Sequence, residues 1–116
     1  MFNNKEKGVL GEKLVTKLLL DKGYLLLAEN KRIGRIEFDI ILAKKNKLFV
    51  VEVKTRTSKI YGEPEEAVTE KKLNNFSNCY YDLVKEYGYE NIVYVVASVF
   101  IDQTTKQTKI KFFKFN

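Results

Sequence analysis

The chain has 116 residues, which suits one compact domain over residues 1–116 that is large enough to bury a core. Its 21 Lys and Arg residues exceed its 15 Asp and Glu residues, for a formal net charge of +6. There is no histidine and only one cysteine, which excludes His-dependent nucleophiles, His or Cys zinc sites and an intrachain disulfide. An active site must therefore use carboxylates, Lys, Arg, Tyr and hydroxyl groups, and oxygen ligands favour a hard cation such as Mg²⁺ or Mn²⁺.

The basic excess has two interpretations that composition alone leaves open. It could serve solubility only, or it could attract the phosphate backbone of a nucleic acid. Residues 1–8 contain no apolar segment of the kind found in a signal peptide, and the apolar runs are too short to span a bilayer. We therefore expect no membrane association and a cytoplasmic location.

The first half of the chain predicts a helix and three strands. The helix covers Asn4–Lys22, with an apolar stripe of Val9, Val15, Leu18 and Leu19. Leu10 and Leu14 fall partly outside this stripe, which is the ground for expecting a homodimer. The predicted strands are Tyr24–Glu29, Arg35–Ala43 and Leu48–Thr55, with a loop at Asn30–Gly34 and a tight turn at Lys44–Lys47 that makes the last two strands an antiparallel hairpin.

The second half predicts a helix and two strands. The helix runs around Thr69–Tyr87 and ends at Gly88. Ile92–Ile101 is almost continuously apolar, as expected for a strand buried on both faces, and Thr108–Phe115 is expected at a sheet edge. The order α-β-β-β-α-β-β predicts an α/β fold with a mixed central sheet and helices on both of its faces.

Charged residues interrupt two of the strands that should be central. In one strand Asp39 shares a face with Glu37, and in the next Glu52 shares a face with Lys54. Burying an unpaired carboxylate costs several kcal/mol, so these groups need partners. A structural ion pair with Lys54 is one solution and a bound cation is the other. The cation is favoured, because one lysine cannot compensate three carboxylates.

Glu12 is a further candidate, on the first predicted helix. It lies three residues before Val15 and seven before Leu19, so it shares their stripe. Its carboxylate could simply interact with the helix dipole, or it could be another acidic group aimed at the sheet. Helical spacing leaves the two interpretations open.

These residues resemble a known family of nucleases. An acidic residue on one strand followed by E-x-K on the next, here Asp39 and Glu52-Val53-Lys54, is the pattern of the PD-(D/E)xK or restriction-endonuclease-like superfamily. The segments Gly8–Glu12, Glu37–Ile41 and Phe49–Arg56 resemble the G-x-x-G-E, G-E-I-D-L-I and F-V-E-V-K-x-R elements of the YraN family. That family comprises predicted endonucleases similar to archaeal Holliday junction resolvases.

The downstream segment also resembles this family, at Tyr61-Gly62, Pro64, Ala67-Val68 and Lys71. Two positions depart from the pattern. Ile36 stands where the family usually has Gly, and Phe49 is one position early. Neither departure removes a candidate ligand.

The resemblance implies a restriction-endonuclease-like fold and a Mg²⁺- or Mn²⁺-dependent endonuclease, a hydrolase of DNA phosphodiester bonds in branched or otherwise structured DNA. It implies that Asp39 and Glu52, with the carbonyl of Val53 and with Glu12 directly or through water, bind the metal. Lys54 would orient the attacking water or stabilise charge on the phosphate. Cutting a junction would require two active sites, hence a homodimer. The candidate nucleic-acid contacts are Lys31, Arg32, Arg56, Lys59, Tyr61 and Lys71.

Three functions remain open at this point. The first is a metal-dependent DNA endonuclease. The second is a catalytically silent nucleic-acid-binding module with a nuclease fold, and the third is a protein-interaction domain whose charged cluster is structural. The complete set of Asp39, Glu52 and Lys54 favours the first over the second. The third predicts neither metal binding nor salt-dependent DNA affinity.

Overall fold

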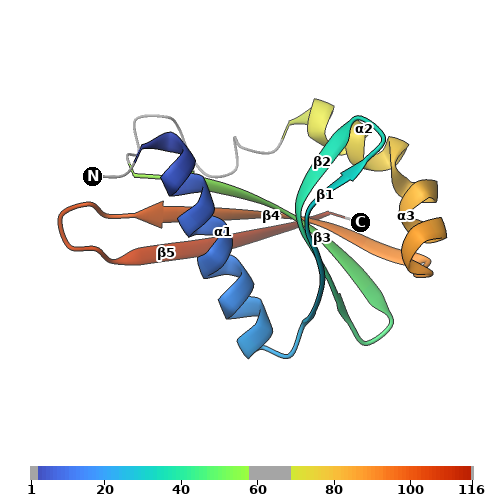
Figure 1. Ribbon diagram of the computed structural model, residues 1–116, viewed down its shortest axis with the longest axis horizontal. Helices are drawn as coiled ribbons and strands as arrows, with labels where there is room; N and C mark the ends of the chain where they lie inside the picture. Colours follow the sequence, from blue (N-terminus) through green and yellow to red (C-terminus); the bar gives the residue numbers. More distant parts are fainter. Residues whose placement is uncertain (1–2, 58–68, 116) are drawn as a thin grey trace.

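The computed structural model describes residues 3–57 and 69–115 (Figure 1). Lys59 and Tyr61, two predicted DNA contacts, lie outside these residues. None of the helices in the described ranges is both long and apolar enough to cross a membrane. The elements in chain order are α1 (Asn4–Asp21), β1 (Leu25–Ile33), β2 (Ile36–Lys44), β3 (Lys47–Arg56), α2 (Glu70–Asn78), α3 (Tyr80–Tyr87), β4 (Asn91–Ile101) and β5 (Thr108–Phe115).

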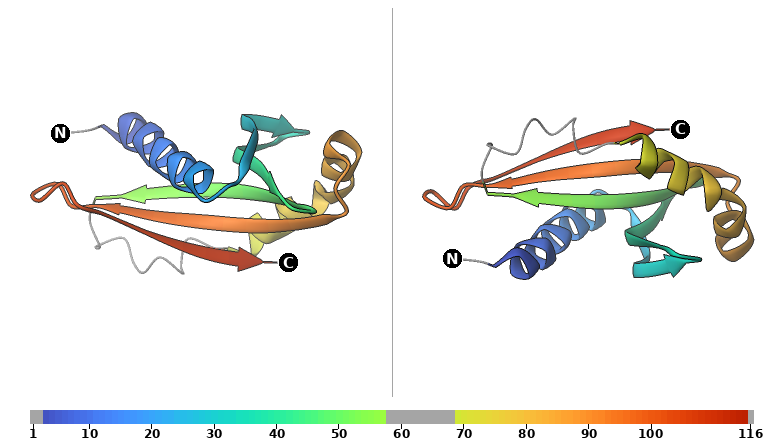
Figure 2. Two further views of the ribbon diagram at one scale, coloured as in Figure 1. Left: turned by 90° about the horizontal axis from the view of Figure 1, so that it is seen from below. Right: turned by 90° about the horizontal axis from the view of Figure 1, so that it is seen from above.

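The strands form one mixed sheet in the order β1-β2-β3-β4-β5. Neighbouring strands are antiparallel except β3 and β4, which run parallel and are joined through α2 and α3. A parallel pair requires such a crossover, because its strands begin at the same edge of the sheet. Figure 2 shows α1 on one side of the plane of β3–β5 and α2 on the other, while the β1–β2 hairpin curls out of that plane and α3 lies beside it. The predicted mixed α/β architecture is confirmed.

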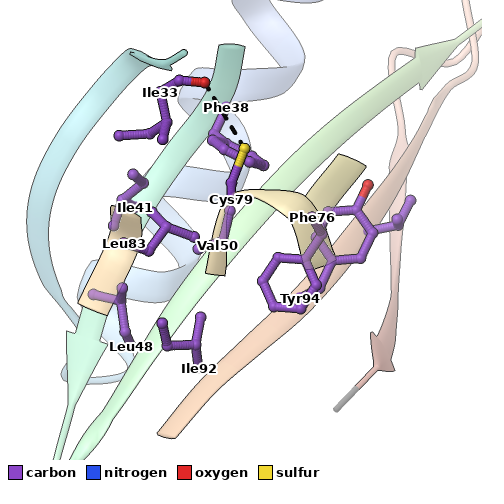
Figure 3. Close-up of a cluster of buried hydrophobic side chains, with 11 residues drawn as sticks. Ile33, Phe38, Ile41, Leu48, Val50, Phe76, Cys79, Leu83, Ile92 and Tyr94 are labelled. Carbon is purple, nitrogen blue, oxygen red and sulfur yellow. Dashed lines mark hydrogen bonds between the residues drawn. The ribbon is translucent and has the colours of Figure 1, made fainter. Parts of the chain in front are cut away.

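Two core clusters fill the two faces of the sheet. Val15 and Leu19 of α1 pack with one cluster, and α2 and α3 supply Phe76, Cys79 and Leu83 to the other. In the second cluster, shown in Figure 3, the rings of Phe76 and Tyr94 stack with centroids 5.2 Å apart. β4 contributes alternate residues to both clusters, which confirms that it is buried on both faces.

Two predicted boundaries are wrong. The expected loop at Asn30–Gly34 is strand almost to its end, because β1 continues to Ile33 and a two-residue turn at Gly34 and Arg35 follows. An edge strand tolerates the charges of this segment, since its outward side chains remain in solvent, while Ile33 is buried. The expected single helix over residues 69–87 is interrupted at Cys79, whose thiol lies 3.8 Å from the carbonyl of Ile33.

The predicted apolar stripe of α1 is rotated relative to the observed one. The buried residues are Gly11, Val15 and Leu19, whereas Val9 is 45% exposed. Leu10 and Leu14 pack against the core cluster on the α1 face. These leucines therefore have partners within the chain, and they no longer argue for a homodimer.

Gly11 allows α1 to approach the sheet closely. A Cβ atom at this position would lie 1.8 Å from Oγ1 of Thr55 on β3, which is far inside van der Waals contact. Gly8, one turn earlier on the same helix, faces open space. The contact at Gly11 sets the distance between α1 and β3, and so it also sets the depth at which the next residue, Glu12, faces the sheet.

We predict that Gly11→Ala lowers the free energy of unfolding by about 2 kcal/mol, because α1 must move away from Thr55. Gly8→Ala is the matched control. It should raise that free energy by about 0.5–1 kcal/mol, since alanine is the better helix former and its Cβ meets no atom. Urea unfolding of both variants measures the difference. Equal effects of the two substitutions would contradict the close approach.

Candidate metal centre

The candidate site lies where β2 separates from β3. The two strands pair from Lys44 opposite Lys47 to Ile40 opposite Val51. Beyond that point β3 keeps its parallel partner β4 as far as Arg56, but it has no further pairing with β2. The backbone of β3 from Glu52 onward is therefore accessible to side chains on its β2 side.

Asp39 occupies this opening. Its Oδ2 accepts a hydrogen bond from the backbone N–H of Val53, at 2.7 Å. The N–H and C=O groups of one residue point to the same side of a strand, so the carbonyl of Val53 faces the same opening. A carboxylate and a backbone carbonyl thus converge where the ladder ends.

The predicted alternation of faces along β2 breaks at Asp39. Strict alternation along this strand would place Ile36, Phe38, Ile40 and Leu42 on one face. Ile40 and Leu42 do pack in the cluster beneath α1, but Phe38 is buried in the opposite cluster and Ile36 packs against it. The reason is the curl of the hairpin away from β3, which changes the direction of the side chains on either side of Asp39 (Figure 2).

Glu12 and Asp39 line one pocket, of about 410 Å³, between α1 and the first two strands. Burial raises the pKa of Glu12 to about 7, and the nearby charges of Asp39, Glu29 and Glu37 add to this effect. Burial also raises the pKa of Asp39, while the hydrogen bond from Val53 opposes the increase. The two carboxylates are therefore neighbours that repel each other, which is the electrostatic setting that a cation would relieve.

Glu52 faces a second pocket, of about 260 Å³, on the α2 side of the sheet. The hydroxyl of Tyr94 donates a hydrogen bond to Oε2, and the ammonium of Lys72 lies 3.2 Å from Oε1. Burial and the bond to Glu52 raise the pKa of Tyr94 well above its ordinary value. Both oxygens of Glu52 thus already have partners within the protein.

Lys54 acts electrostatically on both groups of residues. Its charge opposes the increase in the pKa of Asp39. It also neighbours Lys72, whose pKa is lowered by burial and then by Lys54. The sequence pattern indicates Lys71, which is exposed, as a candidate nucleic-acid contact. It indicates neither Lys72 nor Tyr94 as a residue of the site.

A signal for both missed residues is present in the sequence. Lys72 lies four residues before Phe76 and shares the buried face of its helix, so a charge was to be expected near the core. Tyr94 carries the first polar group in the apolar strand Ile92–Ile101 and requires a partner for it.

The predicted nucleic-acid contacts lie in different parts of the surface. Lys31 forms an ion pair with Glu86 of α3 at 3.0 Å, and Arg32 is exposed, 4.0 Å from Glu37. Arg56 ends β3 and is partly buried, and Lys71 lines the Glu52 pocket. Lys71 is thus placed next to the candidate centre, whereas Lys31 lies against α3.

The donor set fits a hard divalent cation in its chemistry. Asp39, Glu52, Glu12 and the carbonyl of Val53 are all oxygen ligands, as Mg²⁺ and Mn²⁺ prefer. Within residues 3–57 and 69–115, however, no three Asp, Glu, Cys or His side chains gather at metal-ligand spacing. Glu52 must turn from its present partners to join Asp39 at one cation.

We predict that Glu12→Gln stabilises the protein at pH 8 and has little effect at pH 4.5, with a chelator present. The pKa of Glu12 is about 7 in the fold and 4.5 as the ordinary value, so the folded state binds more protons between these values. Its stability therefore falls as pH rises from about 4.5 to 7, and glutamine removes this loss. Melting temperatures measure the effect, with the exposed Glu90→Gln as control. The same gain at both pH values would contradict the assignment.

Comparison with known proteins identifies the family. Residues 11–109 match the family described as "Uncharacterised protein family UPF0102". A UPF0102 protein of Phocaeicola vulgatus is 42% identical over 73 residues, which cover 63% of this chain and 60% of that protein. One of Natranaerobius thermophilus is 47% identical over 68 residues, 58% of this chain and 57% of that protein. The chain thus matches about 60% of the length of such relatives.

Among solved structures, the fold is similar to a fdxN element excision controlling factor protein from Anabaena variabilis. The TM-score is 0.50 at 12% sequence identity, and the alignment covers 90% of this chain and 98% of that one. At this identity the similarity concerns the fold alone. The family is shown by the sequence match over residues 11–109. The chain therefore belongs to UPF0102, the YraN family.

Proposed function

We propose that this protein is a metal-dependent endonuclease that hydrolyses phosphodiester bonds in DNA. The observation that carries the proposal is the opening between β2 and β3. There a strand carboxylate, Asp39, contacts the backbone of the E-x-K segment, Glu52 to Lys54, that follows on the next strand. Membership of UPF0102 and the restriction-endonuclease-like mixed sheet support the same class of protein.

Each residue has a stated role in this proposal. Asp39, Glu52 and the carbonyl of Val53 hold Mg²⁺ or Mn²⁺, and Glu12 joins them directly or through water. When bound, the cation would polarise the phosphate and lower the pKa of a coordinated water. Lys54 orients the attacking water or stabilises the charge that develops on the phosphate.

DNA is the proposed substrate because the chain carries a net charge of +6 and places basic groups beside the candidate centre. Arg56 continues the strand that bears Glu52 and Lys54, and Lys71 lines the adjacent pocket. Branched or otherwise structured DNA is the form to test first, on the resemblance to junction resolvases, and a homodimer is the state that would supply two centres to one junction.

A catalytically silent DNA-binding module is the second candidate. It is favoured by one observation, the engagement of both Glu52 oxygens by Tyr94 and Lys72. If those contacts persist at all metal concentrations, the carboxylates form a structural cluster. DNA cleavage in the presence of Mn²⁺ therefore separates the two candidates.

We predict that the wild-type protein binds Mn²⁺ and cuts DNA, and that the double variant Asp39→Ala and Glu52→Ala does neither. Two ligands and their negative charges are lost in that variant, and the carbonyl of Val53 with Glu12 is too small a ligand set to hold a divalent cation against water. Calorimetry measures binding, and linear, flapped and four-way DNA report cleavage. Glu90→Ala, which removes an exposed carboxylate just before β4, is the matched control and should retain both properties.

The outcomes distinguish the candidates. Binding without cleavage of any of the three DNA forms would favour the silent module. Failure of the wild type to bind Mn²⁺, with and without DNA, would overturn the metal site and leave a structural cluster of charges.

A further inference from the structure

Lys72 is in direct contact with a proposed metal ligand although it lies outside the D…E-x-K pattern. Its Nζ is 3.2 Å from Oε1 of Glu52, and the Lys72 and Glu52 side chains are only 20% and 26% exposed. The other carboxylate oxygen of Glu52 accepts a hydrogen bond from the hydroxyl of Tyr94. A cation that binds Glu52 must therefore share or replace one of these two partners.

The ammonium of Lys72 is itself poorly satisfied. It is shielded from solvent and has no well-aligned hydrogen bond among the residues that the structure describes, so the contact with Glu52 is an ion pair only. Lys54 is its neighbour, which places two ammonium groups close to one carboxylate. Burying a cation is costly unless it is paired and hydrogen-bonded, so Lys72 has unused capacity for a further anionic acceptor.

We propose that Lys72 competes with the divalent cation for Glu52 and, once displaced, binds a phosphate of the DNA. This inference rests on the proposed function. It makes Lys72 a positioning residue that couples two binding events. A cation that takes Glu52 releases Lys72, and a phosphate that takes Lys72 releases Glu52.

The surroundings of Lys72 suit this exchange. The pocket that contains Glu52 and Lys72 also includes Lys71 and Asn75, so an entering phosphate meets further cationic and amide donors. Because the coupling is reciprocal, DNA must tighten cation binding by the same factor as the cation tightens DNA binding. Without Lys72, the factor by which DNA tightens cation binding and the factor by which the cation tightens DNA binding should both fall towards one.

The test is the affinity for Ca²⁺, a hard oxygen-seeking probe, measured by calorimetry for wild type and for Lys72→Gln. We expect Lys72→Gln to bind Ca²⁺ about three- to tenfold more tightly, because a competing positive charge at the ligand is removed. A short DNA duplex should tighten Ca²⁺ binding by the wild type about fivefold or more, and should have much less effect on the variant.

Two further variants complete the experiment. Lys85→Gln removes an exposed charge on α3 and should leave the Ca²⁺ affinity within about twofold of wild type, since exposed charges are screened. Tyr94→Phe removes the hydroxyl from Oε2 of Glu52 without changing charge, retains the buried ring, and should also tighten Ca²⁺ binding. It keeps the test informative should Lys72→Gln fail to fold, which circular dichroism would show.

Each result decides the question. If Lys72→Gln binds Ca²⁺ as wild type does, or more weakly, while the wild type binds and cuts DNA with Mg²⁺, the inference about Lys72 fails and the proposed function stands. If the variant binds Ca²⁺ and the wild type binds barely at all, competition by Lys72 is supported. If neither protein binds with or without DNA, the inference and the proposed function both fail.

Discussion

The hydrogen bond between Asp39 and the backbone of Val53 is the interaction on which the candidate centre depends. A buried strand cannot leave its N–H groups without partners, and β3 loses its neighbour β2 beyond Val51. The Asp39 carboxylate takes over one of these bonds at 2.7 Å, so the ladder ends without an orphaned donor at Val53. The same contact fixes a carboxylate beside the E-x-K segment. A structural requirement of the sheet and a chemical requirement of the centre are thus met by one side chain.

Helix α1 supplies the second constraint. Gly11 lies so close to Thr55 that no larger residue fits, and this contact brings Glu12 into the pocket that contains Asp39. Burial raises the pKa of both Glu12 and Asp39; the charge of Asp39 raises that of Glu12 further, and the charges of Glu52 and Glu37 raise that of Asp39. On the other side of the sheet, Glu52 instead forms an ion pair with Lys72 and accepts a hydrogen bond from the hydroxyl of Tyr94. The carboxylates are therefore divided between two faces, and rotation of Glu52 is the movement that would unite them.

The sequence predicted much of this architecture because periodicity and turn residues carry the relevant physics. The continuous apolar run at Ile92–Ile101 identified the doubly buried strand, and the turn at Lys44–Lys47 identified the hairpin of β2 and β3. Strict alternation failed at Asp39, since the curl of a hairpin depends on packing that no local pattern encodes. The apolar stripe predicted for α1 differs from the observed buried face because glycine carries no hydrophobic signal. Gly11 is nevertheless the residue at which α1 comes closest to β3. Lys72 was not predicted from the sequence because a single lysine is ordinarily a solvent-exposed charge. Its partner, Glu52, is also 20 positions away in the sequence, so no local pattern indicates the ion pair.

The central claim is that one cation can draw Asp39 and Glu52 together at the opening between β2 and β3. A crystal structure of the protein with Mn²⁺, with the metal located by its anomalous scattering, tests this most directly. The account predicts a peak within ligand distance of an oxygen from Asp39, from Glu52 and from the carbonyl of Val53, with Glu52 turned away from Lys72. Absence of a peak at this position at saturating Mn²⁺, with Glu52 still bound to Lys72 and Tyr94, would contradict it.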